Sequence, residues 1–257
     1  MNTIKTAIRR TIENRLAKIA REEKVRILYA CESGSRAWGF ASTNSDYDVR
    51  FIYVRHKSWY LSLDLEHQPS TIERPIVDEL DFSGWDLRKA LQLLRKSNPP
   101  LLEWLRSPIV YEKNSGFLTG MKRLAARAYS PIRTFHHYHH MAKSNYREYL
   151  QKPRVRTKKY FYALRPLLAW QWVLERSGPP PMEFADLLAA AQMPADTRRA
   201  VHTLLAQKRT GQELDDGPRI EPLNQFIEKE LSRPIPQLPT GCVAITAFNR
   251  FFLRYGR

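Results

Sequence analysis

The chain has 257 residues, of which 43% are apolar, and it carries a formal net charge of +16 at pH 7. This length and apolar share allow one large domain or two ordinary ones, while the charge favours a polyanionic partner such as nucleic acid. No apolar run approaches the roughly 20 residues that cross a bilayer, and no signal peptide is evident, so we expect a cytoplasmic protein without a membrane partner.

The first predicted elements are a helix, a strand and a turn. Apolar residues from Ile4 to Ile19 recur at three- and four-residue intervals, which predicts an N-terminal helix. The run from Val25 to Ala30 then predicts a strand that ends at a Gly-Ser turn. Because glycine has no Cβ, a phosphate can approach the backbone at Gly34, and the Ser35 hydroxyl can help to bind it. Arg36 could add a charged contact to the same phosphate.

The second predicted strand, Val49 to Val54, is preceded by two aspartates in the pattern Asp-x-Asp. Side chains two residues apart on a strand point the same way, so we expect Asp46 and Asp48 to reach one divalent cation. Magnesium is the natural choice because it takes hard oxygen ligands from carboxylates and from substrate phosphates.

A further carboxylate is expected from the strand-like segment at residues 76–83. Asp81 is the first choice, and Glu79, two residues earlier on the same expected face, is the alternative. Asp78 would point the other way. Asp86, just before an amphipathic stretch, is expected only to cap the helix that follows.

Beyond residue 116 the pattern becomes helical and is punctuated by prolines. We therefore predict two domains, a strand-containing domain at residues 1–115 and an all-helical domain at residues 116–257. The predicted helices span residues 116–129, 131–150, 157–176, 181–192, 195–208, 220–232 and 242–254.

Basic residues cluster between Arg147 and Lys159 and are interleaved with aromatic residues, a composition that suits phosphate contact combined with base stacking; the tyrosines are Tyr146, Tyr149, Tyr160 and Tyr162. On a helix, Lys159, Tyr162 and Arg165 would share a face, so we predict that these three bind the nucleotide. The alternative is an ordinary solvated, charged face.

Four stretches together resemble the DNA polymerase beta superfamily of nucleotidyltransferases, and in particular its RNA-repair-pathway branch; they span residues 32–40, 45–50, 84–91 and 96–105. The resemblance implies an α/β (α+β) fold with a mixed sheet, flanking helices and a helical domain that completes the nucleotide pocket. It also implies that Asp46, Asp48 and a third strand carboxylate hold two magnesium ions, and that Gly34 and Ser35 hold the triphosphate.

The leading hypothesis is a magnesium-dependent nucleotidyltransferase that moves a nucleoside monophosphate from a triphosphate such as ATP to an acceptor hydroxyl. An RNA end is the preferred acceptor, Asp81 would orient or deprotonate it, and pyrophosphate would leave. Two alternatives remain open: nucleotide attachment to a partner protein, as in toxin-antitoxin systems, and a non-catalytic nucleic-acid-binding module. The preferred nucleotide and the oligomeric state do not follow from these residues.

Overall fold

A computed structural model of the chain describes residues 4–176, 178–210, 216–235, 237–239 and 243–256. The chain divides into two compact units, the first formed by Met1–Ala37, Ser45–Tyr129 and Gly241–Arg257 and the second by Trp38–Asn44 and Ser130–Thr240. The boundary expected between residues 115 and 116 falls within the first unit, and the assignment of domains on either side of it stays a prediction.

The first unit is built on a five-stranded sheet with the order β3-β4-β2-β1-β5. Its strands are β1 (Arg26–Glu32), β2 (Tyr47–Val54), β3 (Thr71–Glu73), β4 (Leu80–Asp86) and β5 (Val110–Lys113). β2 and β4 pair in parallel, and the other neighbouring strands pair antiparallel. The predicted mixed sheet is therefore confirmed.

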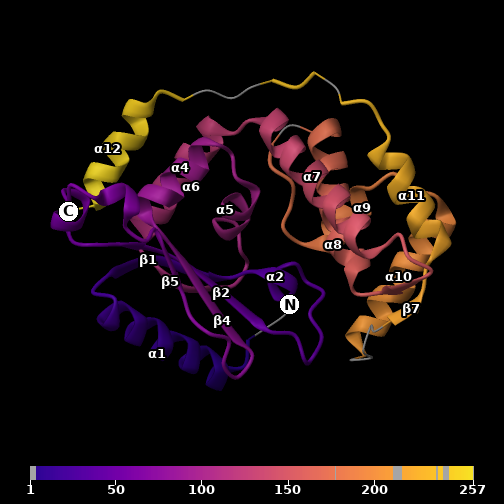
Figure 1. Cartoon of the computed structure of the whole chain (residues 1–257), viewed down its shortest axis with the longest axis horizontal. Coiled ribbons are helices and arrows are strands. Elements are labelled where there is room, and N and C mark those ends of the chain that lie inside the picture. The colour runs from indigo at the N-terminus through magenta and orange to yellow at the C-terminus, as the bar shows by residue number, and fades with distance from the viewer. Residues whose placement is uncertain (1–3, 177, 211–215, 236, 240–242, 257) are drawn as a thin grey trace. The chain divides into compact units, whose positions relative to one another are not determined.

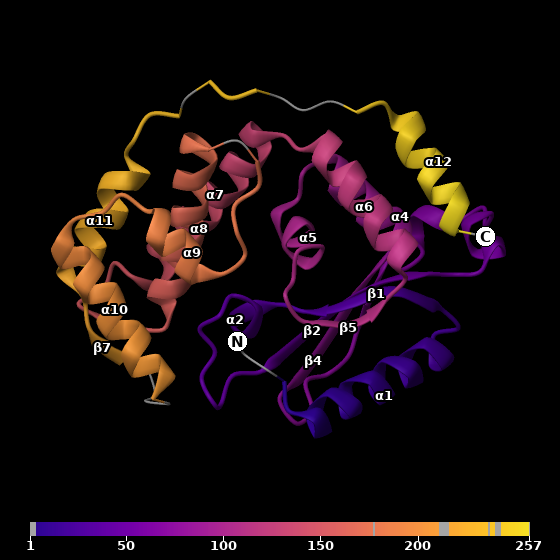
Figure 2. The same ribbon diagram turned by 180° about the vertical axis from the view of Figure 1, so that it is seen from behind.

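Helices cover both faces of this sheet, and the alternation of side chains along β2 explains why. Val49, Phe51 and Tyr53 pack on the side of α1 (Thr6–Glu22), whereas Ile52 and Val54 pack with the helices of the opposite face. That opposite layer contains α4 (Leu87–Arg95) and α6 (Ser115–Ala128), and α12 (Ile245–Tyr255) packs on both of them. Figures 1 and 2 show α1 on one face of the sheet and α4 and α6 on the other.

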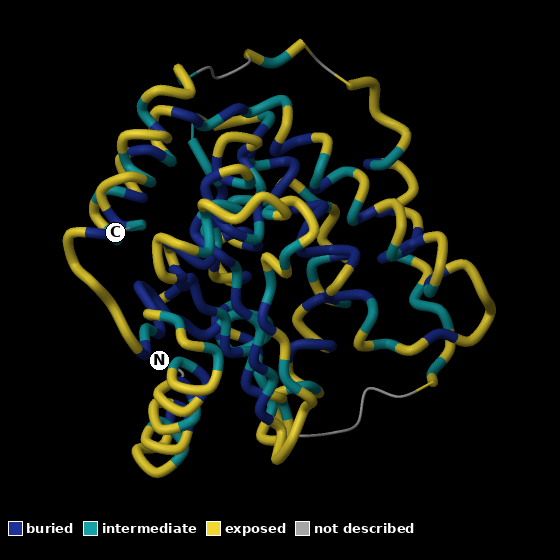
Figure 3. The backbone as a smooth tube through the Cα atoms, turned by 60° about the vertical axis from the view of Figure 1, so that its left-hand side comes forward, coloured by how far each residue is buried: buried dark blue, intermediate teal, exposed yellow. Residues whose placement is uncertain are grey.

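Burial on both faces accounts for the strongly apolar sequence of the central strands. The last six residues of β1 and the last four of β2 are buried, as the dark blue tube in Figure 3 indicates for the interior of the chain. A strand that is covered on both faces loses the apolar-polar alternation of a half-exposed strand. The few polar side chains that these strands do carry are therefore informative.

Shorter elements complete the first unit: α2 (Gly34–Ala37), α3 (Lys57–Tyr60), the 3-10 helix η1 (Leu65–His67) and α5 (Pro99–Trp104). The predicted capping role of Asp86 is confirmed, because its carboxylate accepts a hydrogen bond of 2.8 Å from the backbone N–H of Arg88 at the start of α4.

The second unit is mainly helical and has its own apolar core. Its helices are α7 (Pro131–Tyr149), α8 (Lys159–Glu175), α9 (Phe184–Ala190), α10 (Ala195–Arg209) and α11 (Glu221–Leu231). The sequence pattern located each of them to within a few residues. It did not predict the two-stranded ribbon in which β6 (Arg154–Arg156) pairs with β7 (Asp216–Pro218).

None of the helices in the described ranges is long and apolar enough to cross a membrane.

Candidate active site

The parallel pairing of β2 with β4 places Asp48 directly beside Asp81. Arg50, two residues after Asp48, donates from Nη2 to Asp48 Oδ1 at 2.9 Å and to Asp81 Oδ2 at 2.7 Å. All three side chains are about one quarter exposed or less. One guanidinium thus holds two carboxylates from neighbouring strands on a single face of the sheet, as charge-assisted pairing favours.

Glu79 does not lie beside these two acids, and the expectation that it shares a strand face with Asp81 is wrong. β4 begins only at Leu80, and both Asp78 and Glu79 adopt positive φ in the turn before it, at 55° and 62°. The exposed Asp78 pairs with Arg15 on α1 at 2.9 Å. The turn breaks the two-residue alternation on which the expectation rested, so Asp81 is the carboxylate that the sheet aligns with Asp48.

Asp46 lies one residue before β2, and its side chain is exposed. Arg36 holds the backbone of the segment that leads into β2. Its guanidinium donates to the carbonyls of Ser45 and Asp46 and lies 3.7 Å from the centre of the Tyr47 ring. The predicted phosphate ligand Arg36 therefore also positions the segment that carries the first aspartate.

The Gly-Ser turn lies against the Asp48 carboxylate. Gly34 opens the single turn of α2 with φ of 55°, a conformation that side chains with a Cβ rarely adopt. A Cβ placed on Gly34 would lie only 1.9 Å from Asp48 Oδ2. The backbone N–H of Ser33 also donates to the Asp48 carbonyl at 2.8 Å. Glycine is required here because the carboxylate occupies the space that a Cβ would fill.

Glu32 is a buried acid that sequence reasoning passed over. Its Oε1 accepts a hydrogen bond of 2.8 Å from the backbone N–H of Asp48, and its Oε2 accepts one from the Tyr111 hydroxyl. Burial raises the pKa of Glu32 to about 7, although both hydrogen bonds act in the opposite direction. A glutamate directly after the five apolar residues 27–31 of the strand was the signal that could have identified it.

The charges around Asp48 favour a cation at this place. Burial raises the pKa of the Asp48 carboxyl, and the charges of Asp81 and Asp46 raise it further, against the opposing effect of Arg50. Within the described ranges, no three His, Cys, Asp or Glu side chains are arranged to hold a metal ion. The oxygen donors of Asp48 and Asp81 nevertheless suit a hard divalent cation, and Arg50 supplies the positive charge between them.

The three residues predicted on α8 lie in the second unit. Lys159 Nζ is 3.8 Å from the ring centre of Tyr149 and 5.2 Å from that of Tyr162, which is 44% exposed. Arg165 is buried, lies 4.4 Å from the centre of the Trp38 ring and donates to the Met182 carbonyl at 3.1 Å.

Tyr162 also meets Trp38 edge to face, with ring centres 6.3 Å apart. The expected shared face of α8 therefore includes an indole from the segment after the Gly-Ser turn. The nucleotide-binding roles of Lys159, Tyr162 and Arg165 stay predictions.

The chain is similar in sequence to one protein family and to one curated protein, and it resembles a solved structure. The family described as the RNA repair pathway DNA polymerase beta family matches residues 8–254. An uncharacterized protein of Bacillus subtilis (strain 168), YcgL, is 47% identical over 226 residues, which cover 88% of this chain and 86% of the relative. A solved nucleotidyltransferase-like protein from Exiguobacterium sibiricum 255-15 is 11% identical, with 86% of this chain and 74% of that chain covered and a TM-score of 0.32.

Proposed function

Because the chain belongs to the RNA repair pathway DNA polymerase beta family, we propose that it transfers a nucleoside monophosphate from a nucleoside triphosphate to the hydroxyl of an RNA end. Pyrophosphate is the second product. The observation that carries the proposal is the alignment of Asp48 with Asp81 beside the Gly-Ser turn. A phosphate bound at the Gly-Ser turn would lie close to the carboxylates of both Asp48 and Asp81.

In this proposal Asp46, Asp48 and Asp81 would hold two magnesium ions, whose charge would offset that of the triphosphate and favour loss of the proton from the acceptor hydroxyl. Asp81 orients or deprotonates that hydroxyl. Gly34 and Ser35 hold the triphosphate through backbone N–H groups and the serine hydroxyl, and Arg36 adds a positive charge. The nucleotide contacts assigned to the second unit are Lys159, Tyr162 and Arg165.

RNA is proposed as the acceptor for two reasons. The net charge of +16 suits a partner with many phosphates, and the family is described by a pathway of RNA repair. Attachment of the nucleotide to a protein is the alternative with the same chemistry.

The proposal is tested by incubating the protein with each α-³²P-labelled nucleoside triphosphate, magnesium and a pool of short single-stranded RNAs. We expect label in the RNA with one or more of the nucleotides, and its loss with EDTA or with Asp48→Asn. Label on a protein instead of on RNA would show that the acceptor is a protein. Tight RNA binding without transfer of label would favour a non-catalytic binding module.

Gly34→Ala is expected to lower the rate of this transfer by at least about tenfold, because the added methyl group must displace the Asp48 carboxylate. The matched control is Gly178→Ala, since Gly178 also has positive φ but a Cβ there would have no neighbour within 4 Å. Steady-state rates of the two variants are compared at saturating triphosphate. The comparison separates the effect of the clash with the Asp48 carboxylate from the effect of placing a residue with a Cβ at positive φ. Equal rates for the two variants would contradict the placement of Asp48 against the turn.

A further inference from the structure

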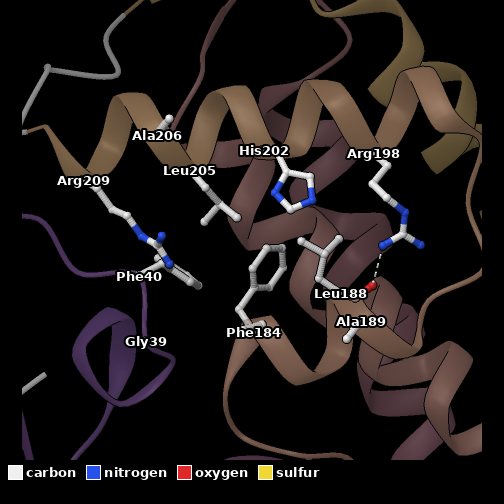
Figure 4. A pocket seen from close by; sticks show the side chains of 11 residues that line it. Gly39, Phe40, Phe184, Leu188, Ala189, Arg198, His202, Leu205, Ala206 and Arg209 are labelled. Carbon is white, nitrogen blue, oxygen red and sulfur yellow. Dashed lines mark hydrogen bonds between the residues drawn. The ribbon is translucent and has the colours of Figure 1, made fainter. Parts of the chain in front are cut away.

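The second unit contains a cavity of about 360 Å³ between α9 and α10, which Figure 4 shows from close by. Ligand pockets in proteins commonly enclose about 300–1,000 Å³, so this one is large enough for a nucleobase with its sugar. The transfer reaction proposed above does not use the residues that line this cavity.

The floor of the cavity is apolar and firmly packed. Phe40, Phe184, Leu188 and Leu205 line it and are almost completely buried. The ring of Phe40 stacks on Phe161 at 4.9 Å between ring centres and meets Phe184 edge to face at 5.4 Å. The aromatic and leucine side chains of the floor are already held in place by packing. They offer a nucleobase an apolar surface, and little side-chain entropy would be lost on binding.

The rim of the cavity is basic and comes from one side of α10. Arg198, His202 and Arg209 follow at intervals of four and seven residues, which places them along one stripe of the helix. In Figure 4 His202 and Arg209 extend from α10 toward Phe184 and Phe40. None of the residues that line this cavity in the described ranges is acidic.

Arg198 has a different task, because it joins the two helices that form the walls. Its two terminal nitrogens donate to the carbonyls of Leu188 and Ala191, at 2.9 and 2.8 Å. These carbonyls lie at the C-terminal end of α9, where backbone acceptors lack helical partners. His202 and Arg209 are therefore the side chains of the rim that are exposed to a ligand.

Positive charge continues beyond the rim. Lys208 Nζ lies 5.7 Å from the ring centre of Phe40 and 6.0 Å from that of Phe161, and burial together with the charge of Lys158 lowers its pKa. Within the described ranges, no carboxylate forms an ion pair with either lysine. Two neighbouring ammonium groups repel each other, and a bound anion would remove that repulsion.

We propose that this cavity binds an unpaired base of the single-stranded RNA acceptor, with Lys158, Lys208 and Arg209 contacting the flanking phosphates. The inference rests on the proposed function and gives the acceptor its own binding residues, separate from Gly34 and Ser35. An RNA strand fits better than a free triphosphate because Lys208 and Arg209 come from α10 and Lys158 from the residue before α8, so the positive charge extends beyond the cavity from two segments, as contact with several phosphates of one strand requires.

The test uses the full chain and a fluorescein-labelled single-stranded 12-mer RNA, with binding followed by anisotropy in EDTA, without nucleotide. Ala206→Trp places an indole in the cavity from an exposed position of α10, and Gln207→Trp places the same side chain beside it, outside the lining. We expect Ala206→Trp to weaken RNA binding at least about tenfold and Gln207→Trp to change it less than twofold.

A second pair separates local charge from total charge. Arg209→Glu and Arg199→Glu alter the net charge equally, on the same helix, but only Arg209 lines the cavity. We expect Arg209→Glu to weaken binding several-fold more than Arg199→Glu at equal ionic strength.

The possible outcomes distinguish this inference from the proposed function. Equal RNA affinity of the two tryptophan variants, with wild-type binding intact, would overturn the cavity assignment and leave transfer to RNA standing. Loss of binding to a fluorescent ATP analogue in Ala206→Trp, without loss of RNA binding, would also overturn it, since the cavity would then hold the triphosphate substrate. Absence of RNA binding by the wild-type protein would overturn both.

Discussion

Asp81→Asn is expected to lower the rate of nucleotidyl transfer by at least about 10³-fold without unfolding the protein. A carboxylate that holds a metal ion contributes to several kcal/mol of charge stabilisation in the transition state, and about 4 kcal/mol corresponds to a factor of about 10³. The amide keeps an oxygen that can accept the hydrogen bond from Arg50 Nη2, so the packing between β2 and β4 should persist. Steady-state rates with labelled triphosphate and RNA measure the loss.

Glu79→Gln is the matched control for Asp81→Asn, because it makes the same chemical change two residues away on an exposed turn. We expect its rate to stay within about twofold of wild type. Asp48→Asn combined with Asp81→Asn should lose little more activity than either single variant, since residues that act as one unit are not additive. A larger loss with Glu79→Gln than with Asp81→Asn would reverse the choice of the third carboxylate.

Glu32→Gln is expected to remove a pH dependence of stability. The folded protein raises the pKa of Glu32 from 4.5 to about 7, so it binds the proton more tightly than the unfolded chain does. The contribution of this group to stability is therefore complete below pH 4.5 and is lost as the pH rises through 7, a fall of about 3 kcal/mol. Glutamine resembles the protonated acid in shape and hydrogen bonding, so its free energy of unfolding should lack this fall.

Urea unfolding in EDTA, at several pH values between 4.5 and 8, measures the difference between Glu32→Gln and wild type. We expect this difference to shift by about 3 kcal/mol in favour of the glutamine variant across the range. Tyr111→Phe should make the total fall larger, because the hydroxyl of Tyr111 stabilises the charged form of Glu32. A difference that is constant with pH would show that Glu32 stays ionised in the folded protein.

Local chemistry explains which features could be predicted from the sequence. The strands around β1 and β2 and the long helices of the second unit follow from runs and periodicities of apolar residues that need no knowledge of distant contacts. Asp86 as a helix cap depends only on residues in the next turn of the chain. The Gly-Ser turn and the Asp-x-Asp pattern likewise lie within one short segment, so the resemblance to the family could be recognised from the sequence.

Pairing between distant segments decided the rest. Arg50 bridges Asp48 and Asp81 only because β2 and β4 pair in one register, and local alternation does not specify that register. Positive φ at Asp78 and Glu79 placed Glu79 in a turn, which a pattern of strand-like residues does not reveal.

The cavity in the second unit shows the same division. The spacing of apolar residues over 195–208 predicts the helix α10, and its several basic residues are evident in the same segment. That Arg198, His202 and Arg209 line one cavity with Phe40 does not follow from the helix pattern, because Phe40 lies far from α10 in the chain and is brought to it by packing. A helix pattern specifies which side chains share a face, whereas the partner of that face depends on how the whole core packs.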